Sequence, residues 1–96
     1  MRMTKQEANE IICTRLGIGP LPYSELAADP YPKIYVDSDA ALRAWSLGRK
    51  YFTDIHPIKP PKWSYRLVGL HAEYADTFPA AVFLGLCAAF GLEVEE

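Results

Sequence analysis

The stretch that most constrains the fold is the run from residue 75 to 91. From Phe78 to Leu92 the sequence contains no charged side chain. Asp76 and Thr77 before it, a proline in its first turn and Gly91 after it are typical of a capped helix. A helix that is apolar on every face must be buried. We therefore expect the rest of the 96-residue chain to wrap around this helix.

The composition predicts one compact, soluble domain over residues 1–96, because half of the residues are hydrophobic. The longest apolar run is shorter than the ~20 residues that span a membrane. The first residues lack the apolar region of a signal peptide, so we expect a cytoplasmic protein. In that setting Cys13 and Cys87 are expected to be buried thiols, with a disulfide as the alternative.

Two more helices follow from capping signals and periodicity. Thr4 and Glu7 form a capping box for a first helix that ends at Gly17. Asp37 and Ser38 cap a second helix. The first helix is expected to carry an apolar stripe of Ala8, Ile11, Ile12 and Leu16, with Lys5, Asn9, Glu10 and Arg15 mostly outside it. The second is expected to bury Ala41, Leu42, Trp45, Gly48 or Arg49, and Phe52.

Alternating patterns predict strands at Lys33–Val36 and Trp63–Ala72, and a short terminal strand or a solvated tail at Leu92–Glu96. The prolines of Ile18–Pro32 indicate an irregular loop with at most a single turn at Ser24–Ala28, and those of Thr53–Lys62 exclude regular structure. The expected class is therefore α/β (α+β): two to four short strands packed with three helices in an α/β/α sandwich.

The run Ala75-Asp76-Thr77-Phe78-Pro79-Ala80-Ala81, continued by Leu86-Cys87-Ala88-Ala89 and Gly91-Leu92-Glu93-Val94, resembles the end of the phage ABA sandwich domain family. The segment Asp39–Trp45 is similar to the middle helix of that family. The resemblance implies an α/β/α sandwich and a phage or prophage origin, hence the cytoplasm of an infected or lysogenic bacterial host. The family has no assigned activity, so it implies no catalytic residue.

Charge is distributed unevenly along the chain. Residues 43–71 contain six basic residues against one acidic residue, although the net charge of the whole chain is −2. Basic residues interleaved with aromatics are typical of protein interfaces and of nucleic-acid-binding surfaces. An ordinary solvated face is the third alternative. The residues that we predict in a protein-binding surface are Arg49, Lys50, Lys59, Lys62, Trp63, Tyr65 and Arg66.

Catalytic motifs are weak. His71 and Glu73 form an H-x-E, but the P-C-x-x-C half of the zinc deaminase signature is missing. His56 has no nucleophile adjacent in sequence, and no G-x-S-x-G surrounds a serine. Asp37 and Asp39 are better explained as helix-capping carboxylates. We therefore predict no catalytic residue, metal site or cofactor, and keep a hydrolase-type or metal-dependent enzyme as an alternative.

The function that we predict is a small phage or prophage accessory protein that binds a host or phage protein, for instance to inhibit a host defence system such as CRISPR. A nucleic-acid-binding accessory protein that uses residues 43–71 is the alternative. No membrane partner is expected. A homo-oligomer, paired through Leu92–Val94 across a two-fold axis, is compatible with either function.

Overall fold

The computed structural model describes residues 2–20 and 30–95, so the turn considered at Ser24–Ala28 lies outside the described residues. The elements follow one another as α1 (Lys5–Leu16), α2 (Ser38–Gly48), a 3₁₀ turn η1 (Arg49–Tyr51), β1 (Phe52–Pro57), β2 (Trp63–Leu67), β3 (Ala72–Ala75) and α3 (Phe78–Ala89). The three strands form an antiparallel sheet in the order β1-β2-β3. This confirms a small α+β fold of three helices and a short sheet.

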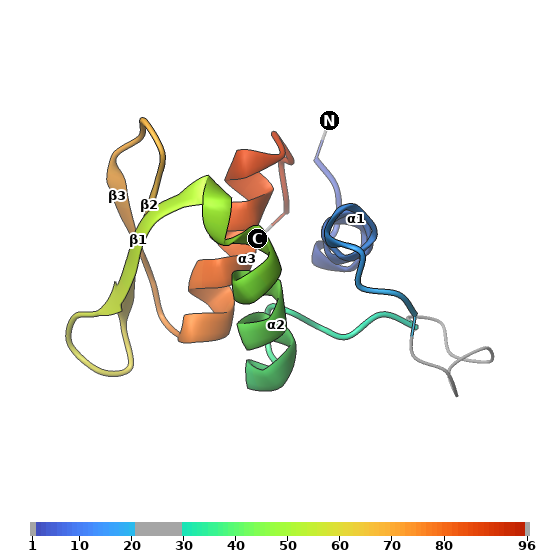
Figure 1. The fold of residues 1–96 in the computed structure, drawn as a ribbon, viewed down its shortest axis with the longest axis horizontal. Helices are drawn as coiled ribbons and strands as arrows, with labels where there is room; N and C mark the ends of the chain where they lie inside the picture. The colour runs from blue at the N-terminus through green and yellow to red at the C-terminus, as the bar shows by residue number, and fades with distance from the viewer. Residues whose placement is uncertain (1, 21–29, 96) are drawn as a thin grey trace.

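The layers are ordered differently from the predicted sandwich. Figure 1 shows the sheet at one end of the molecule, α3 and α2 beside it, and α1 at the far end. The helices therefore lie on one side of the sheet, and the α/β/α order is wrong. The reason is visible in β2, where Tyr65 and Leu67 are buried against the helices while Arg66, on the opposite face, is exposed.

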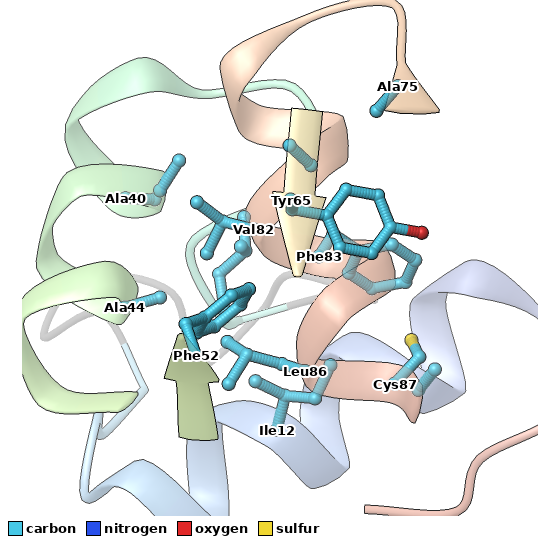
Figure 2. Packing of buried hydrophobic residues seen from close by; sticks show 14 of the residues in the cluster. Ile12, Ala40, Ala44, Phe52, Tyr65, Ala75, Val82, Phe83, Leu86 and Cys87 are labelled. Atoms are coloured by element: carbon cyan, nitrogen blue, oxygen red, sulfur yellow. The ribbon is translucent and has the colours of Figure 1, made fainter. Parts of the chain in front are cut away.

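The sheet approaches α3 at a glycine. A Cβ atom built on Gly85 would lie 2.3 Å from Cε1 of Phe52 and 3.4 Å from Cδ2 of Tyr65. Figure 2 shows Phe52 in this position, between α2 and Leu86 of α3. A side chain at position 85 would push α3 and the sheet apart. Because glycine has no side chain, the two layers can pack at this close distance.

A bulge lets β1 contribute two residues to this core. Phe52 and Ile55 are three residues apart, so in a regular strand they would face opposite sides of the sheet. The pairing of β1 with β2 shifts register between Phe52 and Asp54. With this extra residue both Phe52 and Ile55 pack against the helices.

The predicted capping of α1 is confirmed, and one of its residues is reassigned. Thr4 and Glu7 form the reciprocal capping box, and Gly17 adopts the left-handed conformation with φ 78°. Asn9, predicted to lie mostly outside the apolar stripe, is fully buried instead. Its amide donates to the carbonyl of Pro32 at 2.9 Å and accepts from the N–H of Ile34 at 3.0 Å.

Helix α2 begins as predicted, but its buried face is rotated. The carboxylate of Asp37 accepts from the N–H groups of Asp39 and Ala40, as a cap does. Leu42, predicted in the core, is 58% exposed. The residues that α2 buries are Ala40, Ala41, Ala44 and Gly48. Small residues on this face allow α2 to lie close to α3.

Two predicted strands are corrected. Residues 33–36 form a turn, closed by the N–H of Asp37 donating to the carbonyl of Lys33 at 2.9 Å. The segment Trp63–Ala72 is not one strand, because the chain reverses at Gly69, whose φ is 80°. Its first part, Trp63–Leu67, is β2, residues 68–71 form the reversal, and the chain returns as β3, which begins at Ala72 and pairs antiparallel with β2.

The segment Thr53–Lys62 was predicted to be irregular, and this is wrong for its first half. Thr53 to Pro57 belong to β1, and the prolines sit only at its end and in the hairpin loop. Pro57 is tolerated because β1 lies at the edge of the sheet. The loop closes through the N–H of Ile58, which donates to the carbonyl of Lys62 at 3.1 Å.

The two described ends of the chain meet. Val94 forms an isolated parallel bridge with Met3 rather than a longer strand. The N–H of Met3 donates to the carbonyl of Glu93 at 2.9 Å, and the N–H of Glu95 donates to the carbonyl of Met3 at 2.8 Å. This bridge holds residues 92–95 in place beside α3.

Candidate functional site

The apolar helix α3 is not covered on every face, contrary to the sequence-based expectation. Its N-cap is Thr77, as predicted, and most of its side chains are buried. Ala80, Leu84 and Ala88, however, are spaced four residues apart and so form one stripe along the helix. Leu84 is 39% exposed and Ala88 is exposed as well. The structure therefore leaves an apolar stripe of its most hydrophobic helix open to solvent.

This stripe forms the floor of a groove of about 500 Å³. Tyr74 and Ala75 of β3 line one wall of the groove, and Leu92 and Val94 of the C-terminal segment line another part of it. The volume lies within the range of about 300–1,000 Å³ that is typical of ligand sites. We call this the α3 groove.

The charged residues around the α3 groove are mainly acidic. Asp76 and Glu95 line it together with a single basic residue, Lys5. A smaller hollow of about 170 Å³ shares Tyr65 and Ala88 with the groove and adds Glu73. Three carboxylates and one lysine therefore border the groove and the adjoining hollow, and their net negative charge around the apolar floor favours an occupant that is apolar with basic ends.

The two titratable side chains deepest in the groove are neutral at physiological pH. Burial raises the pKa of the Cys87 thiol from 9.0 to about 12. Burial, followed by the negative charge of Glu73, raises the pKa of the Tyr65 hydroxyl. Figure 2 shows the hydroxyl of Tyr65 and the sulfur of Cys87 on the same side of α3. A protonated, buried thiol is a poor nucleophile.

The strand that borders the α3 groove is open on one side. Within residues 2–20 and 30–95, β3 pairs with β2 only, in unbroken register. An edge strand presents backbone N–H and C=O groups that can pair with another chain. The opposite edge of the sheet, β1, carries a bulge and ends in Pro57, and both features hinder such pairing.

The predicted basic residues do not converge on one patch. Arg49 and Lys50 lie in η1, before β1 begins, whereas Lys59 and Lys62 lie in the loop after β1 ends. A six-residue strand separates the two pairs by roughly 17 Å. Arg66 is exposed on β2, and its Nε donates to the carbonyl of Leu70 at 3.1 Å.

The two predicted aromatic residues point toward the helices. The ring of Trp63 packs at 4.9 Å between centroids on Phe78 of α3, and Tyr65 is only 9% exposed. Neither ring is presented on the outer face of the sheet for base stacking, which argues against the nucleic-acid alternative. Tyr65 nevertheless lines the α3 groove, so one of the seven predicted residues reaches the site.

The candidate catalytic residues lie on two sides of the sheet. His71 and Glu73 line the small hollow beside α3. His56 lies on the outer face, where its Nδ1 hydrogen-bonds the carboxylate of Asp54. Ser64 faces His56 across the strands but is 5% exposed, and the described residues provide no hydrogen bond between them. No group of three or more His, Cys, Asp or Glu in the described part of the chain is arranged to hold a metal ion.

Comparison with known proteins defines the fold alone. No family model and no curated protein matches the chain. The crystal structure of a phage protein from Bacillus cereus ATCC 14579 is similar, with a TM-score of 0.62 at 15% identity over 99% of this chain and 94% of that one. In the part of the chain that the structure describes, no helix is long and apolar enough to cross a membrane.

The sequence analysis did not predict the α3 groove, because the groove exists only where no described element packs against α3. One signal was present: α3 is apolar all round, yet a chain of 96 residues has few elements with which to enclose it. An excess of apolar helix over covering surface is itself a reason to look for a docking site.

Proposed function

We propose that this protein is a phage or prophage accessory protein that acts by binding another protein through the α3 groove. The observation that carries the proposal is the exposed apolar stripe around Leu84, which lies between the C-terminal segment and the edge of β3 that no described strand pairs with. Apolar surface of this kind is retained where a partner covers it. The phage origin is supported by the resemblance in α3 and by the phage protein with a similar fold.

We propose a non-enzymatic role, since the described histidines are divided between the two faces of the sheet. A host defence complex such as CRISPR is the class of target that best fits a small phage accessory protein. The corresponding test is the plating of a targeted phage on a CRISPR-immune strain that expresses the protein. Rescue of plating by the wild type, and its loss in a groove variant, are the expected results.

The direct test is site-specific photo-crosslinking in bacterial cells. Position 84 in the α3 groove and position 42 on α2 form a matched pair, since both are exposed leucines on helices. We expect a crosslinking residue at position 84 to capture a discrete protein partner that is absent at position 42. Equal capture at both positions, or capture only at Lys59 in the hairpin loop, would contradict the groove as the contact surface.

A further inference from the structure

The residues that line the α3 groove, and their charges, restrict the kind of ligand that can bind in it. A strand added to the free edge of β3 would continue the inner face of the sheet, the face that carries Tyr65, Glu73 and Ala75. Side chains on that face would then meet the floor formed by Ala80, Leu84 and Ala88. The groove has the shape that accepts an extended segment whose alternate residues point toward α3.

We propose that the α3 groove binds an extended peptide segment of a partner as a fourth strand beside β3, with apolar residues at alternate positions and Lys or Arg at its ends. This inference rests on the proposed function and specifies the partner. The alternate apolar residues cover Leu84 and its neighbours in the stripe. The backbone of the peptide pairs with β3, which is four residues long, so about four residues of the peptide make the contact.

The basic ends follow from the carboxylates around the α3 groove. Asp76 and Glu95 line it, and Glu73 points to the inner face of the sheet from the edge strand itself. A charge directed inward on an edge strand opposes pairing with a neutral or acidic strand. A Lys or Arg at the end of the peptide reaches Glu73 diagonally across the strands and removes this penalty, so the same residue rejects unsuitable strands and selects basic ones.

A second copy of this chain is a poorer occupant. Two copies paired symmetrically through β3, with the same face inward, would bring the two Glu73 carboxylates close together near the two-fold axis. Like charges placed in that way are destabilising. The charge of the groove therefore favours a different, basic partner over self-association.

The first experiment selects peptides from a displayed library of random heptapeptides on the immobilised wild-type protein, with counter-selection on Leu84→Glu. We expect the selected peptides to alternate apolar and variable residues and to carry Lys or Arg at the ends. In calorimetric titrations of one selected peptide, Leu84→Glu should weaken binding by about tenfold or more, because it places a charge at the centre of the contact. The matched variant Leu42→Glu on α2 should leave the affinity unchanged.

Two further measurements test the strand geometry and the charge selection. N-methylation of the peptide at alternate amides should weaken binding by about tenfold, whereas methylation at the intervening amides should be tolerated, because only one set faces β3. Glu73→Lys, an exposed substitution that leaves the core intact, should shift the preference from basic toward acidic ends.

Several results would overturn the inference. These are the absence of any enriched peptide, apolar residues spaced three and four apart as on a helix, and equal sensitivity to N-methylation at every amide. A wild-type dimer that Leu84→Glu dissociates, measured by light scattering, would also overturn it, because the occupant would then be a second copy. Crosslinking of a partner at position 84 without strand-like peptides would reject this inference and keep the proposed function.

Discussion

Replacing Gly85 by alanine tests the close contact between α3 and the sheet. The new Cβ atom would lie 2.3 Å from Cε1 and 2.5 Å from Cζ of Phe52, whereas carbon atoms pack at about 3.5–4.0 Å. The Phe52 ring has little room to retreat, since it is buried and Trp45 packs edge-on against it at 5.0 Å between centroids. The layers must therefore separate, or the ring must leave its site.

The magnitude follows from two opposed effects. Alanine in a helix is favoured over glycine by about 1 kcal/mol. Overpacking a core costs about 1–3 kcal/mol and occasionally more, and loss of all packing by a buried phenylalanine sets a limit of about 3–5 kcal/mol. A contact as short as 2.3 Å places the cost of overpacking between these figures, at about 2–4 kcal/mol. After the gain in helix propensity is subtracted, we expect Gly85→Ala to lower the free energy of unfolding by about 1–3 kcal/mol, and the Tm by about 5–20 °C for a chain of this size.

The assay is urea unfolding followed by tryptophan fluorescence, with Gly48→Ala as the matched control. A Cβ atom at Gly48 would meet Cδ2 of Leu86 at 2.8 Å, which is the far end of a flexible side chain. We expect this variant to stay within about 1 kcal/mol of the wild type, because the helix propensity of alanine offsets a small shift of Leu86. If Gly85→Ala proves as stable as Gly48→Ala, the account of the layer spacing is wrong.

Four other predictions concern the core, the buried thiol and the surface. Asn9→Ala should cost about 2–4 kcal/mol in urea unfolding, because it leaves the N–H of Ile34 without its acceptor and the carbonyl of Pro32 with the weak thiol donor of Cys13 at 3.7 Å. Asn9→Asp should not restore this stability at neutral pH, because it buries a carboxylate next to the carbonyl oxygen of Pro32. The free energy of unfolding should fall as the pH rises from 9 toward 12, by about 1.4 kcal/mol per pH unit. The reason is that Cys87, whose pKa is raised to about 12 in the folded state, keeps its proton there while the unfolded chain loses it. Cys87→Ala should flatten this pH dependence. The double variant Lys59→Glu and Lys62→Glu should change the free energy of unfolding by less than about 0.5 kcal/mol and leave crosslinking at position 84 intact. Loss of this crosslinking would indicate that the partner binds the basic residues of the segment 43–71. Mass spectrometry should find Ser64 unlabelled by a fluorophosphonate, because it is buried; labelling would favour the hydrolase alternative.

The parts of the fold that were predictable are those held by local interactions. The capping box at Thr4 and the left-handed Gly17 involve residues within a few positions of each other, so their patterns are readable in sequence. Asn9 was misplaced because both of its partners lie more than 20 residues away. Strand β1 was missed because prolines that belong to its end and to the loop obscured its pattern.

The site was less predictable than the fold, for a physical reason. The basic residues of the segment 43–71 are close in sequence, but β1 holds Lys50 and Lys59 at opposite ends. The α3 groove, in contrast, joins β3, α3 and the segment around Val94, which are brought together only by folding. Its existence depends on the part of α3 that no described element covers. A sequence pattern alone does not show which part of α3 is left uncovered.

Hydrogen exchange measured on the protein with and without a selected peptide tests the central claim most directly. The amides of β3 that face away from β2 are predicted to exchange rapidly in the free protein and to become protected when the α3 groove is filled. The other edge strand, β1, serves as the internal control and should not change. Protection confined to β1 or to the loop around Lys59, with none in β3, would contradict the account.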